Sequence, residues 1–238
     1  MSRSTTTIKK NFRDDSISIV ILAAGVGSRI RSNEPRSLIK IKNQTLLSHQ
    51  AETVSQTFKN HEIIGVFGTH LEKILKKADR RVRVIENQLF QETNNAESMR
   101  LGLNSSMYDN VLFVHGDIFF QKDLIKSADY SRSFLVVDAN RDMADKEVGV
   151  TINGDRVSIL SYGLEKKWCQ MCFITGKELK ILKNIFLKFE KTDKKMLSFE
   201  VINKIIENGG SFVCHEKKGS HVVEIDCIKD IKNENFNL

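Results

Sequence analysis

The chain has 238 residues, of which 40% are hydrophobic and 28% are charged, and these fractions exclude a largely disordered protein. A single proline and 13 glycines exclude collagen-like and proline-rich classes. The 37 lysines and arginines exceed the 30 aspartates and glutamates, which gives a formal net charge of +7. The basic residues form short, scattered runs without interleaved aromatic residues, a pattern that favours phosphorylated small molecules over nucleic acid as partners.

The polar residues 1–16 are expected to form a flexible tail, and residues 17–238 a single domain. No apolar run approaches the roughly 20 residues needed to cross a bilayer, so we expect a cytoplasmic protein with no membrane partner. Cys169 and Cys172 form a CxxC pair, which invites a metal or redox interpretation. The surrounding pattern predicts a strand, however, whose residues three apart face opposite ways. We therefore expect reduced core thiols.

Strand-like and helix-like segments alternate through the first 140 residues. Strands are expected at 18–22, 63–67, 82–85, 111–115 and 134–137, with a short extended piece at 38–41. The helices expected between them lie at 46–58, 71–78, 97–104 and 123–128. This alternation predicts an α/β fold, a three-layer αβα sandwich around a doubly wound, mostly parallel sheet.

The second half of the chain changes character. Strands are expected at 148–152, 157–162 and 168–174, and Asn153-Gly154 is expected to form the turn of a hairpin. Helices at 178–189 and 199–207, two late strands at 212–215 and 222–225, and a final helix at 228–232 should follow. Because no Ser/Pro-rich linker separates the halves, we expect one mixed sheet with an inserted antiparallel β-region.

A glycine turn, Ala23-Ala24-Gly25-Val26-Gly27-Ser28-Arg29, directly follows the first strand. In open α/β sheets ligands bind beyond the carboxyl ends of strands, and glycines let main-chain N–H groups approach phosphate oxygens. Ile30 replaces the third glycine of a dinucleotide fingerprint, and no Walker lysine follows. Arg29 and Arg36 add two cations, which suits a triphosphate; a plain turn with surface arginines is the alternative.

An aspartate, Asp117, ends the strand at 111–115 within the sequence His115-Gly116-Asp117. A buried carboxylate is costly unless it is paired, so we expect a metal or an arginine beside it, with a capping role as the alternative. Glu224 and Asp226 are two residues apart and share a strand face. Carboxylates from separate strands, together with a phosphate chain, are the ligands that Mg²⁺ prefers.

Taken in order, these segments resemble the MobA-like NTP transferases, nucleotidyltransferases with a GT-A-like fold and the signature LAAGxGxR…PKxL. The resemblance rests on ILAAGVGSRIRSNEPRSLIKI, NNAESM, VLFVHGD and VVEID, and it spans about residues 17 to 232. The middle segment and the EID ending are most similar to the choline-phosphate cytidylyltransferase-like branch. The resemblance implies a Mg²⁺-dependent enzyme that moves a cytidylyl group from CTP to a small phosphorylated alcohol or amine and releases pyrophosphate.

The resemblance also implies roles for individual residues. The catalytic set would be Arg29, Arg36, Asp117 and Asp226, of which the two aspartates would ligate Mg²⁺. The nucleotide would be held by Leu22, Ala23, Ala24, Gly25, Gly27 and Arg29, with Asn95 and Ser98 beside the base. One position departs from the family pattern, because Arg36 stands where the family has a lysine, and its planar fork differs from the compact charge of an ammonium.

The acceptor is the most open part of the prediction. A choline-like ammonium would require aromatic faces and a carboxylate, for which the candidates are Tyr162, Trp168, Phe119, Phe120 and Glu147. A core role for the single tryptophan is the favoured alternative, and His115 is expected to be a satisfied core histidine rather than a base.

Rival functions are a sugar-1-phosphate nucleotidyltransferase, a 2-aminoethylphosphonate nucleotidyltransferase and a degenerate, non-catalytic nucleotide-binding protein. Arg36 motivates the last of these. The sequence leaves open the choice between CTP and UTP and the oligomeric state.

Overall fold

A computed structural model describes residues 16–25, 35–138, 147–216, 219 and 222–225. The tail expected at residues 1–16 lies outside these ranges except for Ser16, and the helix expected at 228–232 lies outside them entirely. Within the described ranges, no helix has both the length and the hydropathy needed to span a membrane.

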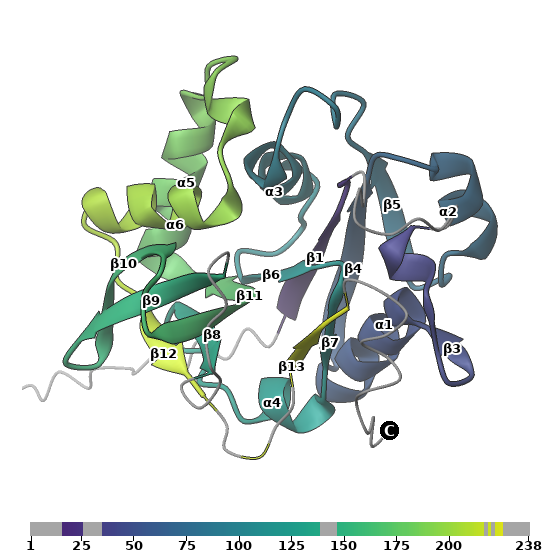
Figure 1. The fold of residues 1–238 in the computed structure, drawn as a ribbon, viewed down its shortest axis with the longest axis horizontal. Helices are drawn as coiled ribbons and strands as arrows, with labels where there is room; N and C mark the ends of the chain where they lie inside the picture. The colour runs from purple at the N-terminus through teal and green to yellow at the C-terminus, as the bar shows by residue number, and fades with distance from the viewer. Residues whose placement is uncertain (1–15, 26–34, 139–146, 217–218, 220–221, 226–238) are drawn as a thin grey trace, which may run out of the picture.

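A nine-stranded sheet in the order β5-β4-β1-β6-β11-β8-β12-β10-β9 organises the molecule (Figure 1). Its first four strands are mutually parallel: β5 (Val82–Glu86), β4 (Asn60–Phe67), β1 (Ser16–Ala23) and β6 (Val111–His115). Two of these strands, β1 and β6, are near-continuous runs of buried, mostly apolar residues. Such runs are typical of parallel strands that are covered on both faces, as the sequence predicted.

The other half of the sheet is mixed. β11 (Lys166–Ile174) runs antiparallel between β6 and β8 (Phe134–Asp138), and β12 (Val213–His215) is parallel to β8. β9 (Val148–Asn153) and β10 (Arg156–Tyr162) form an antiparallel hairpin, and β9 also pairs with the start of β11. The sheet therefore curls back on itself here, which confirms the expected inserted antiparallel region.

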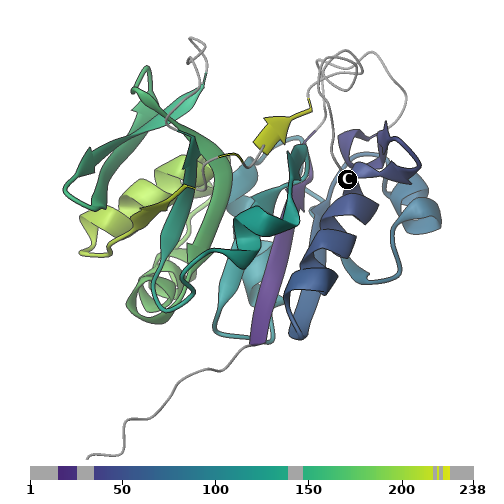
Figure 2. The same ribbon diagram turned by 90° about the horizontal axis from the view of Figure 1, so that it is seen from below.

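Helices cover both faces of the sheet (Figures 1 and 2). On one face, an apolar core includes residues of α1 (Leu46–Thr57), α2 (Leu71–Lys77) and α4 (Lys122–Lys126). On the other face, a second core includes residues of α3 (Asn95–Asn104), α5 (Gly176–Leu187) and α6 (Ser198–Glu207). The expected three-layer αβα arrangement is therefore correct. The sheet is not mostly parallel as expected, because four of its pairings are parallel and five are antiparallel.

Two short ladders lie apart from the main sheet. β2 (Lys40–Ile41) pairs with β3 (Gln44–Thr45), and β7 (Ile118–Phe120) pairs with β13 (Val222–Glu224). The sequence did not predict β7, because its three residues are few for a strand and its partner, β13, lies far away in the sequence. The β9–β10 turn is at Gly154 and Asp155, one residue later than expected, because Gly154 takes the left-handed φ of +65°.

The CxxC cysteines lie on opposite faces of the sheet, as predicted. Cys169 packs in the core beneath α1 and α4, whereas Cys172 packs in the core beneath α3 and α5. Burial raises the pKa of the Cys172 thiol, so it stays protonated. Among the described residues there is also no cluster of three His, Cys, Asp or Glu side chains.

One glycine sets how closely a helix approaches the sheet. A Cβ at Gly102 would lie 2.2 Å from Cγ1 of Val20, so only glycine lets α3 pack this close to β1. The close approach brings the start of α3, at Asn95, beside the carboxyl end of β1, where Leu22 and Asn95 line the same cavity.

Candidate active site

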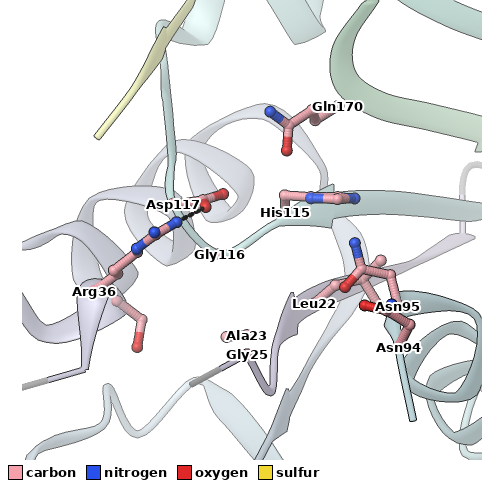
Figure 3. A pocket seen from close by; sticks show the side chains of 11 residues that line it. Leu22, Ala23, Gly25, Arg36, Asn94, Asn95, His115, Gly116, Asp117 and Gln170 are labelled. Carbon is pink, nitrogen blue, oxygen red and sulfur yellow. Dashed lines mark hydrogen bonds and ion pairs between the residues drawn. The ribbon is translucent and has the colours of Figure 1, made fainter. Parts of the chain in front are cut away.

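A cavity of about 380 Å³ opens at the carboxyl ends of β1 and β6 (Figure 3). This is the edge at which ligands bind in open α/β sheets, and both sequence motifs reach it. The residues that line it are Leu22, Ala23, Gly25, Arg36, Ser37, Asn94, Asn95, His115, Gly116, Asp117 and Gln170.

The two motifs meet through Gly116. Its N–H donates to the carbonyl oxygen of Leu22 at 2.8 Å, and a Cβ at this position would lie 2.6 Å from the Cβ of Ala23. The glycine of the HGD sequence is therefore required for the close contact between the β1 and β6 ends. The described part of the glycine turn ends at Gly25, so Gly27 and Arg29 lie outside the described residues.

Arg36 and Asp117 form an ion pair within the cavity. Arg36 begins the short 3₁₀ helix η1 (Arg36–Leu38), and its Nη1 lies 2.8 Å from Oδ2 of Asp117. Both side chains are mostly buried. The other carboxylate oxygen, Oδ1, is buried without a hydrogen-bond partner among the described residues. The expectation that Asp117 needs a cation beside it is confirmed, and the cation present is the arginine that departs from the family pattern.

Asp226 lies outside the described residues, but the chain leading to it reaches the cavity. In the β7–β13 ladder Glu224 pairs with Ile118, and the N–H of Ile225 donates to the carbonyl oxygen of Asp117 at 2.8 Å. The residue before Asp226 is therefore bonded to the main chain of Asp117, 108 positions earlier in the sequence.

The start of α3 supplies another part of the cavity. Asn94 and Asn95 line it, whereas Ser98 is buried one turn further on and accepts a long hydrogen bond, at 3.4 Å, from Nδ2 of Asn87. The N–H of Asn94 donates to the carbonyl oxygen of Lys194 in the 3₁₀ helix η2 (Asp193–Lys195) at 2.8 Å. Of the two residues predicted beside the base, the structure brings Asn95 to the cavity and leaves Ser98 behind it.

His115 lines the cavity as a neutral, hydrogen-bonded ring. Burial lowers its pKa, and this effect outweighs the nearby Asp117 carboxylate and a hydrogen bond to Gln170, which both favour the protonated form. Its Nε2 lies 3.0 Å from Oγ of Ser198, and its ring meets that of Trp168 edge to face. It is satisfied, as expected, but it belongs to the cavity wall rather than to the core.

Gln170 is a cavity residue that the sequence analysis missed. It sits in a β-bulge of β11, between Trp168 and Cys172, with a left-handed φ of +56°. Its Nε2 donates to Oε2 of Glu224 at 2.8 Å. A non-glycine residue in this conformation costs about 1–3 kcal/mol, and such strain clusters at functional sites.

A buried lysine lies behind Gln170. Lys167 is only 5% exposed and makes a short ion pair with Glu147. Its Nζ also lies 3.8 Å from Oε2 of Glu224. Glu147, predicted to meet the charge of an acceptor, therefore faces a lysine of the protein instead.

Comparison with known proteins finds a family match in the first part of the chain. Residues 19–129 match the MobA-like NTP transferase domain.

Two curated relatives match the chain over longer segments. The bifunctional protein GlmU of Francisella philomiragia is 30% identical over 160 residues, 64% of this chain and 34% of that protein. A probable UDP-N-acetylglucosamine pyrophosphorylase of Encephalitozoon cuniculi is 25% identical over 245 aligned residues, 83% of this chain and 72% of the relative. The chain thus spans about a third of the GlmU protein.

Solved structures agree on a mixed α/β nucleotidyltransferase fold of the GT-A type. The inositol-1-phosphate CTP transferase of T. maritima has a TM-score of 0.74 at 20% identity and covers 90% of both chains. The CTP:phosphocholine cytidylyltransferase LicC of Streptococcus pneumoniae has a TM-score of 0.70 at 19% identity, over 91% of this chain and 96% of that one. At these identities the likeness establishes the fold alone.

The aromatic box expected around an ammonium group does not form among the described residues. Trp168 is 4% exposed and donates its Nε1–H to the carbonyl oxygen of Met171, and Phe119 and Phe120 are fully buried. Tyr162 is 50% exposed and packs edge to face on Phe199. The core role for the single tryptophan is therefore correct, because its large apolar surface is covered by α3, α5 and the sheet.

Proposed function

We propose that this protein transfers a nucleotidyl group from a nucleoside triphosphate, with CTP favoured, to a small phosphorylated alcohol or amine and releases pyrophosphate. The observation that carries the proposal is the convergence of the glycine turn, Arg36 and Asp117 on one cavity at the carboxyl edge of β1 and β6. The match of residues 19–129 to MobA-like NTP transferases supports it.

The cavity suggests how the nucleotide is held. The main chain at Leu22, Ala23, Ala24 and Gly25 would meet the triphosphate, because these residues leave the end of β1 without bulky side chains in the way. Gly27 and Arg29 would extend this contact along the phosphates. Asn95 would lie beside the base, with Ser98 supporting it from the buried side.

The reaction requires positioning and charge neutralisation rather than a base. An oxygen of the acceptor phosphate would attack the α-phosphorus in line, so that a new P–O bond forms as the bond to pyrophosphate breaks. That oxygen is already anionic near neutral pH. His115, whose lowered pKa keeps it neutral, is consistent with a site that moves no proton. Arg36 would neutralise charge that shifts toward pyrophosphate, since a guanidinium presents five donors and can contact a carboxylate and a phosphate together.

The described residues fit a magnesium ion. Oδ1 of Asp117 is a buried carboxylate oxygen without a hydrogen-bond partner among the described residues, and Mg²⁺ is usually held by one or two carboxylates together with substrate phosphates. Asp117 and Asp226 would hold the ion, because Ile225, next to Asp226, is bonded to Asp117. When bound, Mg²⁺ supplies Lewis-acid neutralisation of phosphate charge.

Three alternatives keep part of this scheme. A sugar-1-phosphate or 2-aminoethylphosphonate nucleotidyltransferase would use the same cavity with another acceptor. A degenerate, non-catalytic nucleotide-binding protein is favoured by one specific observation, the arginine that already pairs with Asp117.

The proposal is tested by pyrophosphate release with each of the four ribonucleoside triphosphates, Mg²⁺ and a panel of phosphorylated alcohols and amines. We expect release that depends on both the nucleotide and the acceptor and is fastest with CTP. Calorimetric binding of CTP without release for any acceptor would favour the degenerate protein. Fastest release with UTP and a sugar 1-phosphate would replace the cytidylyl assignment.

A further inference from the structure

The cavity has two walls because of the strand order. β1, β6 and β11 are adjacent, in that order. Figure 3 shows Ala23 and Gly25 on one side of His115 and Asp117, and Gln170 on the other. We call Leu22, Ala23, Gly25, Asn94 and Asn95 the nucleotide wall, and His115 and Gln170 the acceptor wall. If the nucleotide occupies the glycine-turn side, as proposed above, the acceptor must approach from the side of Gln170.

The carboxamide of Gln170 is held in one orientation. Glu224 is a carboxylate and can only accept when ionised, so the atom that faces it at 2.8 Å is the amide nitrogen. The amide nitrogen is thus committed to Glu224, and Gln170 lines the cavity beside His115. A carboxamide has two N–H donors and two acceptor lone pairs, so the nitrogen can donate once more and the oxygen can accept from a ligand.

The backbone at Gln170 is strained, which indicates that the orientation of the side chain is maintained at a cost in free energy. The residue keeps a left-handed φ of +56° although glycine would adopt it without strain. Glu224 also lies within 3.8 Å of buried Lys167, which fixes the carboxylate that in turn holds Gln170. Glu224 is therefore a positioning residue for the amide.

The uncharged amide of Gln170 is suited to hydroxyl groups. A hydroxyl both donates and accepts, so it can satisfy either end of the amide, whereas a primary ammonium can only donate and a quaternary ammonium does neither. The aromatic faces that a quaternary ammonium needs are buried at Trp168, Phe119 and Phe120, and Glu147 is paired with Lys167.

We propose that Gln170 is a specificity-determining residue that hydrogen-bonds a hydroxyl of the acceptor, and that the acceptor is a hydroxyl-rich sugar or polyol phosphate. This inference rests on the proposed function, since it takes the same cavity as the site of transfer. It narrows the acceptor from phosphorylated alcohols and amines to the polyhydroxylated class.

Binding calorimetry with a non-hydrolysable CTP analogue and Mg²⁺ tests the proposal directly. Wild-type protein should bind inositol 1-phosphate at least about tenfold more tightly than phosphocholine or 2-aminoethylphosphonate. Gln170→Met keeps the length of the side chain and removes the amide. This substitution should weaken the binding of inositol 1-phosphate about tenfold. The affinities for the other two acceptors and for the CTP analogue should stay within about twofold of the wild-type values. Equal losses for all acceptors, no loss, or tighter wild-type binding of either amine would overturn the proposal.

A second substitution separates the contact from folding. Gln170→Gly removes the amide but relieves the strained φ, so its melting temperature should match or exceed that of the wild type while the selective loss persists. His70→Gly is the matched control, because His70 has a φ of +55° and lies outside the cavity; it should not change any affinity.

The anchor is tested by a double-mutant cycle. Glu224→Ala should weaken inositol 1-phosphate selectively, and adding it to Gln170→Met should cause little further loss, because both remove the same contact. Full additivity would mean that Glu224 does not act through Gln170.

Turnover is a separate readout. If acceptor selectivity and its loss are observed without pyrophosphate release, the proposed function fails and the role of Gln170 stands. Pyrophosphate release without this acceptor selectivity would support the proposed function and contradict the role of Gln170.

Discussion

The two walls of the cavity are built in different ways. The nucleotide wall is mostly main chain and short side chains from the end of β1 and the start of α3. The acceptor wall depends on side chains that come from four strands or their ends: His115 on β6, Lys167 and Gln170 on β11, Glu147 before β9 and Glu224 on β13. A wall of main-chain groups can bind phosphate whatever the neighbouring side chains are, whereas a wall of paired side chains changes its chemistry with one substitution.

This difference predicts where substitutions act. Changes on the nucleotide wall should alter nucleotide binding only when they block the main chain, as a side chain at Gly116 would through its contact with Ala23. Changes on the acceptor wall should alter acceptor choice and stability together, because the side chain that contacts the ligand is held by buried charge. The four predictions below begin where the walls meet.

The largest effect is expected at Asp117, between the two walls. Asp117→Asn keeps the shape but removes the charge that pairs with Arg36 and the oxygen proposed to hold Mg²⁺. Loss of a preorganised electrostatic group at the reacting phosphates should lower kcat by about 1000-fold in the pyrophosphate-release assay. Asp109→Asn is the matched control, because Asp109 is exposed and pairs with Lys183 away from the cavity. An Asp117→Asn variant within tenfold of the wild type would remove Asp117 from the catalytic set.

Arg36 should give the next largest effect and decide between an enzyme and a degenerate relative. Arg36→Ala removes the cation beside Asp117 and should lower kcat about 100-fold, whereas Arg36→Lys restores the residue of the family signature and should retain or raise it. Single-turnover rates with saturating CTP measure this step.

Two other results for Arg36 would change the assignment. A wild-type chain that binds CTP but transfers to no acceptor, together with turnover in Arg36→Lys, would identify a degenerate enzyme. Unchanged turnover in Arg36→Ala would contradict the role given to this position. Lys40 and Lys166 would then be the next cations to substitute.

The ion pairs behind the acceptor wall should matter for stability. Lys167→Met leaves Glu147 and Glu224 without their buried cation, and uncompensated charge in a poorly solvated site is costly. The two carboxylates are partly exposed, so we expect a loss of about 2 kcal/mol in the free energy of unfolding, measured by urea denaturation. Arg132→Met, which breaks an exposed pair with Asp129, should cost less than about 0.5 kcal/mol. Equal losses would mean that Lys167 is not held as a buried charge.

The nucleotide wall could be predicted from the sequence because its parts are local. Each of two short motifs can be recognised from a few adjacent residues: the glycine turn after one apolar strand and the aspartate at the end of another. The two motifs lie close together because their strands are neighbours in the sheet. The alternating apolar pattern likewise predicted the layers, the six α-helices and all the strands of the main sheet described here. It did not predict β3 or β7, which are two and three residues long, and β7 pairs with the distant β13.

The acceptor wall could not be predicted because its parts are distant and its geometry is irregular. Gln170 reaches the cavity only through a bulge and a left-handed φ, for which a glutamine in an apolar strand gives no signal. Glu147 looked available to a ligand because nothing in the sequence reveals its pairing with Lys167. Trp168 was a candidate for the aromatic box because it is the only tryptophan in the sequence. In the folded protein it packs in the core instead.

The smallest effect concerns the neutral state of the acceptor wall. Burial lowers the pKa of His115 below its ordinary value of 6.5, so below pH 6.5 the unfolded chain binds a proton that the folded chain does not. The free energy of unfolding therefore falls as the pH falls through this range and is constant above it, at most about 1.4 kcal/mol per pH unit for each such histidine. His49, whose pKa burial also lowers, contributes in the same direction.

His115→Gln should remove one of these two contributions while keeping a hydrogen-bonding group opposite Ser198 and Gln170. Between pH 7.5 and 5.5, a window that lies above the lowered pKa values of the paired carboxylates such as Glu97, the variant should lose about 1 kcal/mol less stability than the wild type. A His115→Gln slope equal to that of the wild type would mean that the ring accepts a proton as readily in the folded chain as in the unfolded one. The acceptor wall would then present a cation below pH 6.5, and its preference for hydroxyl groups over an ammonium would rest on repulsion instead of hydrogen bonding.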